Sequence, residues 1–156
     1  MKKTVIFDEM ELEYPNDLVI MDKEELNKKF SGSENRWAVK NQEKHMIISV
    51  VKLNPNAIMG FLTDEKSVAN GIKIRIKKNM QDYHEIGTIK TNVDGRKACG
   101  FVYDYLVKDT DVRQYSEVLV ISLKRRFYVV QYYSQLESNN DNINIYHNFL
   151  NSVRFR

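Results

Sequence analysis

Cysteine and histidine are the residues best suited to chemistry in this chain, and their spacing does not favour a catalytic site. The chain has one cysteine, Cys99, and three histidines, His45, His84 and His147, which lie far apart in the sequence. A zinc site needs three or four converging ligands, and no pair here has metal-ligand spacing. Cys99 falls within an expected strand, where a free cysteine usually behaves as a small buried hydrophobe. We therefore predict no metal, no cofactor and no catalytic residue.

Motifs for phosphate binding and for paired carboxylates are also missing from the sequence. The six glycines form neither GxGxxG nor GxxxxGK, the patterns that cradle phosphates. The acid pairs Asp8-Glu9 and Glu24-Glu25 are adjacent in sequence, so their side chains point apart. Paired-carboxylate catalysis would need acids brought together from distant positions. The sequence favours a protein that is not an enzyme.

Aromatic residues are the enriched class, with nine tyrosines, seven phenylalanines and one tryptophan. Tyr103 and Tyr105 share one face of an expected strand at 100–107. One interpretation is core packing, with the tyrosine hydroxyls reaching the rim of the core. The other is a binding face, because tyrosine, tryptophan and arginine dominate interface hot spots.

The only tryptophan, Trp37, follows Arg36, a long cation that often accompanies it at interfaces. Burial of Trp37 as a core anchor is the alternative interpretation. Our hypothesis is that Arg36, Trp37, Tyr103 and Tyr105 rim a groove under a helix at 64–83 and there contact another protein.

Size and composition indicate one globular domain covering residues 1–156. Hydrophobic residues make up 42% of the chain and charged residues 29%, which is ordinary for a globular protein. The net charge of +3 is too mild to predict nucleic-acid binding. The apolar run near the start ends at Asp8, too early for a signal peptide, and no stretch has transmembrane length. A single cysteine favours a reducing compartment, so we expect a cytoplasmic protein without membrane contact.

The C-terminal part of the chain gives the clearest structural pattern. Residues 118–123 and 127–134 are apolar at both alternating positions, which is typical of central strands covered on both faces. A basic turn at 124–126 joins them. A helix is expected at 141–152, because apolar residues recur there at helical spacing: Ile143, Tyr146 and Leu150.

Other segments complete the expected α+β pattern. Asp22 with Glu25 forms a capping box that starts a short helix ending at Phe30, and Asp94-Gly95 is a strong hairpin turn. The remaining expected strands are 4–7, 10–14 (close to a sheet edge), 18–21, 36–40, 46–53, 86–93 and 97–107.

Residues 63–83 fit two patterns. Ile72, Ile74 and Ile76 alternate like a strand, whereas a longer stripe is spaced like a helix and follows an N-cap at Thr63. We predict the helix, although Gly71 lowers its stability by about 1 kcal/mol relative to alanine.

The order of these elements resembles the Mog1/PsbP-like superfamily, which includes small bacterial proteins of unknown function. The resemblance rests on the opening Glu11–Asn16, the helix at Thr63–Tyr83, the strand Gly100–Val107, and the final hairpin and helix closing with Ser152–Phe155. It implies an antiparallel twisted sheet of about six to seven strands with helices packed on its faces.

The resemblance also bears on function, because members with known roles act by binding partners. It implies a non-enzymatic protein-binding or scaffold domain. The alternative is a small-ligand-binding protein or small hydrolase with a pocket between the long helix and the sheet.

Overall fold

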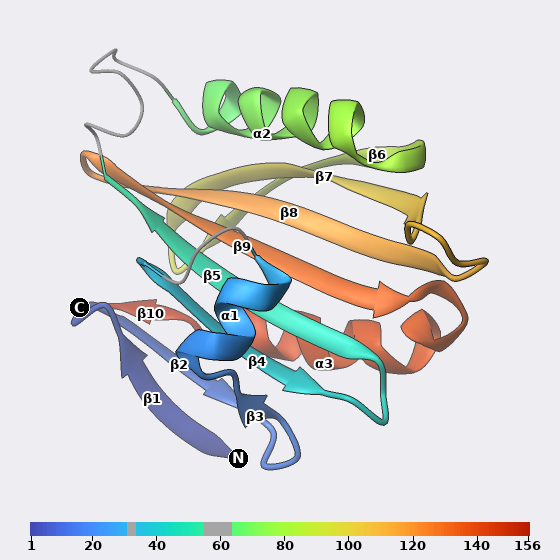
Figure 1. Ribbon diagram of the computed structural model, residues 1–156. Helices are drawn as coiled ribbons and strands as arrows, with labels where there is room; N and C mark the ends of the chain where they lie inside the picture. Colours follow the sequence, from blue (N-terminus) through green and yellow to red (C-terminus); the bar gives the residue numbers. More distant parts are fainter. Residues whose placement is uncertain (31–33, 55–63) are drawn as a thin grey trace.

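The hairpin of β8 (Arg113–Leu123) and β9 (Arg126–Gln135) lies at the centre of a seven-stranded antiparallel sheet. The computed structural model, shown in Figure 1, describes residues 1–30, 34–54 and 64–156. The strand order is β3 (Val19–Ile20), β4 (Arg36–Asn41), β5 (Met46–Leu53), β9, β8, β7 (Arg96–Leu106) and β6 (Gln81–Val93). Two central strands with apolar residues on both faces were the clearest expectation from the sequence, and the register confirms it.

A second sheet of three strands lies beside the large one. It contains β1 (Lys2–Ile6), β2 (Met10–Tyr14) and β10 (Arg154–Phe155), with β2 in the middle. Residues 10–14 were expected close to a sheet edge, and β2 lies next to both edge strands of this small sheet. Their alternation indicated one covered face correctly, but the partner β10 comes from the far end of the chain, and local periodicity carries no information about such pairing.

The helices are α1 (Lys23–Lys29), α2 (Glu65–Asn79) and α3 (Asn139–Ser152). The capping box of α1 is present, because Asp22 accepts from the Glu25 amide and Glu25 accepts from the Asp22 amide. Asp64 caps α2 by accepting from the Ser67 amide at 2.9 Å. The helical interpretation of this segment is confirmed, but α2 ends at Asn79 because the chain enters β6 at Gln81. The predicted cap Thr63 lies outside the described residues.

Helices cover both faces of the large sheet (Figure 1). On one face α2 packs against β7, β8 and β9 in a core that includes Val68, Ile76, Phe101, Val118 and Val129. On the opposite face α3 and the small sheet pack together, in a larger core that includes Met10, Leu119, Val130, Tyr146 and Phe149. The expected architecture, a twisted antiparallel sheet with helices on its faces, is confirmed.

Glu9, in the turn between β1 and β2, ties the small sheet to the large one. Its carboxylate accepts hydrogen bonds from Arg126 Nε at 2.7 Å and from the Tyr128 hydroxyl, and it lies 3.6 Å from Lys52 Nζ. The Glu9 side chain is 13% exposed. Burial alone would raise the pKa of Glu9, but the hydrogen bonds from Arg126 and Tyr128 outweigh burial and lower it.

A depressed pKa makes Glu9 a source of acid sensitivity. Because its folded pKa lies below the unfolded value of about 4.3, Glu9 stabilises the fold above that value, and the stabilisation is lost as pH falls through the folded pKa. We expect Glu9→Gln to lower the unfolding free energy at pH 7 by about 1–3 kcal/mol. It should also flatten the pH dependence of that free energy below about pH 5. Urea titrations from pH 3 to 7 check this, with the exposed Glu24→Gln as the control; equal acid sensitivity of both variants would contradict it.

Gly100 in β7 permits a close approach to β8. A Cβ added at Gly100 would overlap the carbonyl oxygen of Val118, whereas one added at Gly71 in α2 meets nothing within 4 Å. We expect Gly100→Ala to lower the unfolding free energy by about 3 kcal/mol or more, through displacement of a central strand. Gly71→Ala, the matched control, should raise it by about 1 kcal/mol through helix propensity. Chemical denaturation measures both, and two changes of the same sign would refute this account.

Candidate functional site

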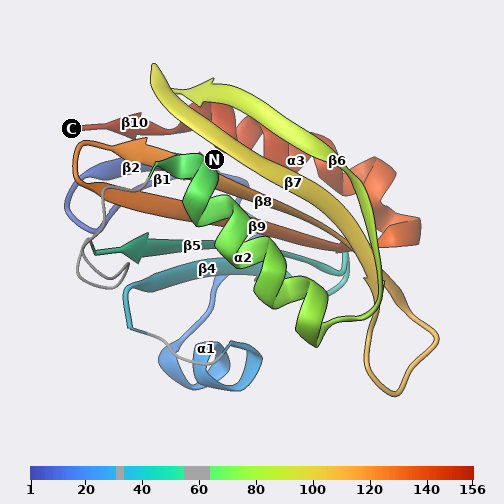
Figure 2. The ribbon, with the colours of Figure 1, turned by 90° about the horizontal axis from the view of Figure 1, so that it is seen from above.

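Helices α1 and α2 lie over the same face of the large sheet. Directly paired residues of antiparallel strands point to one side, and one such row runs from Ala38 through Ser49 and Gln131 to Val118. Ala38, at one end, packs under α1, and Val118, at the other, packs under α2. Seen from above, β4 and β5 run between the two helices (Figure 2). The middle of this face is polar, and we call it the α1–α2 face.

Arg36 lies on the α1–α2 face in a half-buried position. Its Nη1 donates to Ser49 Oγ at 2.6 Å and to Gln131 Oε1 at 3.2 Å. Its guanidinium carbon lies 4.1 Å from the centre of the Phe30 ring, a cation–π contact. Burial lowers the pKa of Arg36, yet an arginine remains charged because its pKa starts so high.

No carboxylate among the described residues forms an ion pair with Arg36. Residues 31–33 and 55–63 contain no aspartate or glutamate. The guanidinium is therefore a half-buried charge that the chain itself does not neutralise.

Tyrosines continue the α1–α2 face from Arg36 towards α2. The Tyr133 ring lies 6.2 Å from that of Phe30, and the rings of Tyr103 and Tyr105 stack at 5.7 Å. Burial raises the pKa of Tyr133 well above its usual value and that of Tyr103 to about 12. These phenols are neutral hydrogen-bonding groups at physiological pH.

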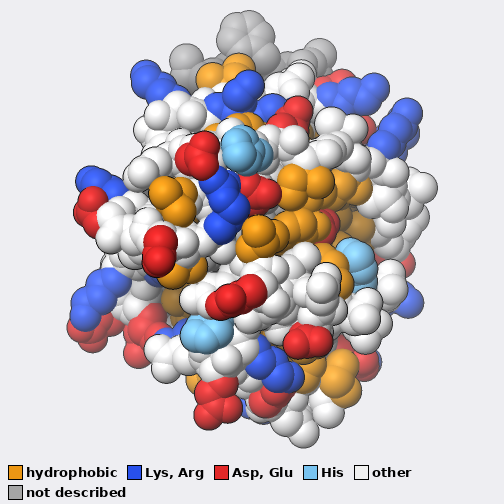
Figure 3. All heavy atoms as spheres, turned by 90° about the vertical axis from the view of Figure 1, so that its right-hand side faces the viewer, with side chains coloured by type: hydrophobic (Ala, Val, Ile, Leu, Met, Phe, Trp, Pro, Cys, Tyr) orange, Lys and Arg blue, Asp and Glu red, His pale blue; other side chains and the backbone are white. Residues whose placement is uncertain are grey.

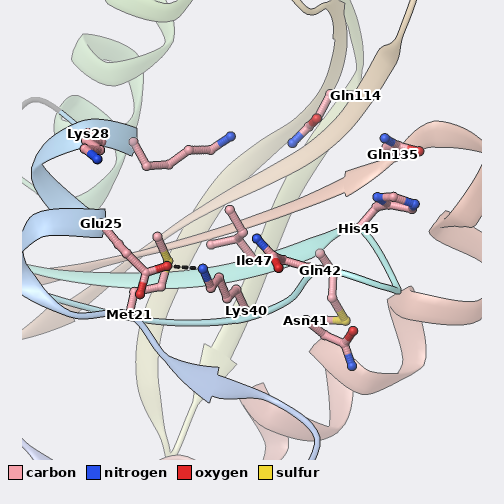
Figure 4. Close-up of a pocket in the computed structure, with 12 residues that line it drawn as sticks. Met21, Glu25, Lys28, Lys40, Asn41, Gln42, His45, Ile47, Gln114 and Gln135 are labelled. Atoms are coloured by element: carbon pink, nitrogen blue, oxygen red, sulfur yellow. Dashed lines mark hydrogen bonds and ion pairs between the residues drawn. The ribbon is translucent and has the colours of Figure 1, made fainter.

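A hollow of about 460 Å³ opens between α1 and the sheet at one end of this face. Figure 4 shows Glu25 and Lys28 on one side of it and His45 and Gln135 on the other. The full lining is Met21, Glu25, Lys28, Lys29, Lys40, Asn41, Gln42, His45, Met46, Ile47, Gln114 and Gln135. Lys40 pairs with Glu25, the only acid of the lining, so the hollow is basic overall.

Three of the four residues predicted to bind a partner lie on one face of the sheet, although strands β5, β9 and β8 separate Arg36 in β4 from the two tyrosines in β7. Arg36, Tyr103 and Tyr105 lie on the α1–α2 face, but Trp37 points to the opposite face. There its ring is 5.6 Å from that of Tyr14 and stacks on Phe149 at 6.3 Å. The expectation that all four rim one groove is wrong, because neighbouring residues of a strand point to opposite faces. Trp37 is a half-buried member of the core, as the alternative interpretation had it.

Tyr103 does not rim an open groove either, because its side chain is 0% exposed. Tyr105 is half-buried and lies nearer the edge of the face. Any role of these residues in binding remains a prediction.

The basic hollow beside α1 was missed by the sequence interpretation. Two signals pointed to it: α1 ends in Lys28 and Lys29, and Arg36 and Lys40 are four residues apart in one strand. Residues at even spacing in a strand share a face, so these two cations had to lie on the same side. The packing of α1 on that side could not be deduced from the pattern.

The predicted pocket between the long helix and the sheet is a smaller hollow, of about 230 Å³, with Lys66 and Lys73 of α2 on one side and Cys99 on the other. Burial raises the pKa of the Cys99 thiol, which disfavours the thiolate that a nucleophile needs. In the described parts of the chain, no three His, Cys, Asp or Glu residues converge as a metal site would require.

Within residues 1–30, 34–54 and 64–156, no helix is long and apolar enough to span a bilayer.

The burial difference between the two stacked tyrosines gives a stability test. We expect Tyr103→Ala to lower the unfolding free energy by about 3–5 kcal/mol, because it empties a fully buried position. Tyr105→Ala, at a half-buried position beside it, should lower the unfolding free energy clearly less than Tyr103→Ala does. Denaturant titrations measure the unfolding free energy of both variants. A Tyr103→Ala protein as stable as wild type would show that this side chain is not part of the core.

No family model and no curated protein matches the chain. Solved structures do match it. The PsbP of the cyanobacterium Synechocystis sp. PCC 6803 is 14% identical, with a TM-score of 0.69 over 99% of this chain and 92% of that one. The Ran-binding protein Mog1p of Saccharomyces cerevisiae is 10% identical, with a TM-score of 0.62 over 98% and 94%.

A protein of unknown function from Pseudomonas aeruginosa is 12% identical, with a TM-score of 0.58 over 100% of this chain and 97% of that one. At these identities the likeness concerns the fold. Because the matches span nearly the whole of both chains, the resemblance noted in the sequence is confirmed at that level, and the chain has a Mog1/PsbP-like fold.

Proposed function

We propose that residues 1–156 form a single non-enzymatic domain that binds another protein through the α1–α2 face. The observation that carries this proposal is Arg36, a half-buried guanidinium that no carboxylate of the described chain neutralises. A buried charge without a counter-ion costs stability. A site that keeps such a charge is poised to receive the counter-ion from a partner.

The chemistry of the face fits an acidic segment of a protein. Nη1 of Arg36 is engaged by Ser49 and Gln131, and no hydrogen bond of its Nε or Nη2 is found within the described ranges. A carboxylate that approached these two nitrogens would form the paired hydrogen bonds typical of arginine. Lys28 and Lys29, which line the hollow beside α1, would attract further acidic residues of the partner.

The shared fold supports a binding role without identifying the partner. The yeast structure of similar fold is that of a Ran-binding protein, and the partner of that protein is not transferred to this chain. The single cysteine is the basis for placing the binding in a reducing compartment such as the cytoplasm.

The alternative, a small-ligand-binding protein or hydrolase working under α2, has weaker support. The hollow there is half the size of the one beside α1. The raised pKa of Cys99, the cysteine that lines it, opposes catalysis by a thiolate nucleophile.

Arg36→Gln tests the proposal through affinity capture from native lysate followed by mass spectrometry. Wild type should retain a reproducible, stoichiometric protein. Arg36→Gln should retain at least about ten-fold less of it, the scale of an interface hot spot. The matched control is Arg125→Gln, an exposed arginine in the β8–β9 turn, which should capture as wild type does.

The stability of the variant separates binding from folding. We expect Arg36→Gln to change the unfolding free energy by no more than about 1 kcal/mol, because lost hydrogen bonds are offset by removal of a half-buried charge. Equal capture by wild type and by folded Arg36→Gln would refute a role for this face. Capture of no stoichiometric protein at all would refute the proposed function.

A further inference from the structure

Glu117 is a buried carboxylate on the opposite face of the sheet from Arg36. Its residue is 6% exposed, and its hydrogen-bond partner is the Tyr115 hydroxyl, which donates to Oε2 at 2.7 Å. No lysine, arginine or histidine of the described chain lies within 4.0 Å of it. Residues 31–33 and 55–63 contain no basic residue. A buried carboxylate without a counter-ion is in an unfavourable position, because burial removes water from the charge.

Three tyrosines surround this carboxylate. The rings of Tyr132 and Tyr146 stack at 4.5 Å with an interplanar angle of 7°, and Tyr115 meets Tyr132 edge-on at 6.0 Å. Burial raises the pKa of all three, so they carry no charge at physiological pH. The Tyr146 hydroxyl is fully buried and has no hydrogen-bond partner among the described residues. A second polar group is therefore left unsatisfied next to the carboxylate.

Glu117 and Tyr146 line the same cavity of about 330 Å³, between α3 and strands β6 and β8. Ile89, Leu119 and Leu150 give it apolar walls, while Thr91, His147 and Asn151 also border it. Ligand pockets begin at about this size. On the side of the molecule to the right in Figure 1, hydrophobic side chains gather across the strand ends between α2 and α3, with charged groups around them (Figure 3).

We propose that this cavity binds a small organic cation of the alkylammonium class. The ammonium group would supply the positive charge that the described chain does not place beside Glu117, and the Tyr146 hydroxyl oxygen can accept a hydrogen bond from its N–H. Tyrosine rings attract cations through their π-faces, and the apolar walls suit the methylene chain. The site is distinct from the α1–α2 face: it lies on the other side of the sheet and selects the opposite charge.

The probe is butylammonium, titrated into the full chain and followed by amide chemical shifts. Saturable shifts are expected at Glu117, Leu119 and Tyr146, and butanol, a neutral molecule of similar length, should bind at least ten-fold more weakly. Glu117→Gln keeps an acceptor for Tyr115 but removes the charge, so it should weaken butylammonium binding at least ten-fold. Glu137→Gln, an exposed acid outside the cavity, is the matched control and should bind as wild type does.

The comparison of butylammonium with butanol tests whether the cavity prefers a cation, and it does so even if Glu117→Gln fails to fold. Equal binding of butanol and butylammonium, shifts confined to exposed acids, or undiminished binding by a folded Glu117→Gln would each overturn the proposal. A blocked lysine, Nα-acetyl-lysine methylamide, identifies the source of the cation. Shifts of the same amides by both probes would show that a partner's lysine can occupy the cavity, and shifts by butylammonium alone would assign it to a free amine.

Discussion

The central hairpin has apolar side chains on both faces, and the rest of the fold follows from covering them. Leu119, Ile121 and Val130 face α3 and the small sheet, while Val118, Val120 and Val129 face α2. Two covers are needed because neither face can be left in water without losing the main stabilising contribution of the hydrophobic effect. The chain supplies one cover from its middle. The other is assembled from its two ends, which meet in the pairing of β2 with β10.

Charged groups of this fold differ in how completely the chain neutralises them. Glu9 is matched by Arg126, Lys52 and the Tyr128 hydroxyl, so its charge contributes to holding the two sheets together. Arg36 is half-buried and Glu117 is buried, and neither has a counter-ion among the described residues. Such uncompensated groups lower stability, and proteins commonly tolerate this loss where a site serves function. The two groups are separated by the sheet, so each is available to a different ligand.

The helices and strands could be predicted from the sequence better than the contacts that they make with one another in space. Apolar residues on both faces of 118–123 and 127–134 were sufficient to identify central strands, and Asp94-Gly95 placed the β6–β7 turn correctly. The placement of Trp37 failed because spacing along the chain was treated as closeness in space, although residues 36 and 37 of a strand must point to opposite faces. Glu117 gave no signal, because its isolation depends on which side chains α3 carries over the sheet.

The pairing of β2 with β10 has a consequence for synthesis on the ribosome. The β1–β2 hairpin is synthesised before the strands of the large sheet, but its third strand, Arg154–Phe155, follows all the other described elements in the sequence. Until then β2 pairs with β1 alone and offers an unpaired edge on which other chains can add a strand. We therefore expect nascent chains to expose an edge that favours aggregation until Arg154–Phe155 has been synthesised, and a chain without these two residues to keep that edge exposed.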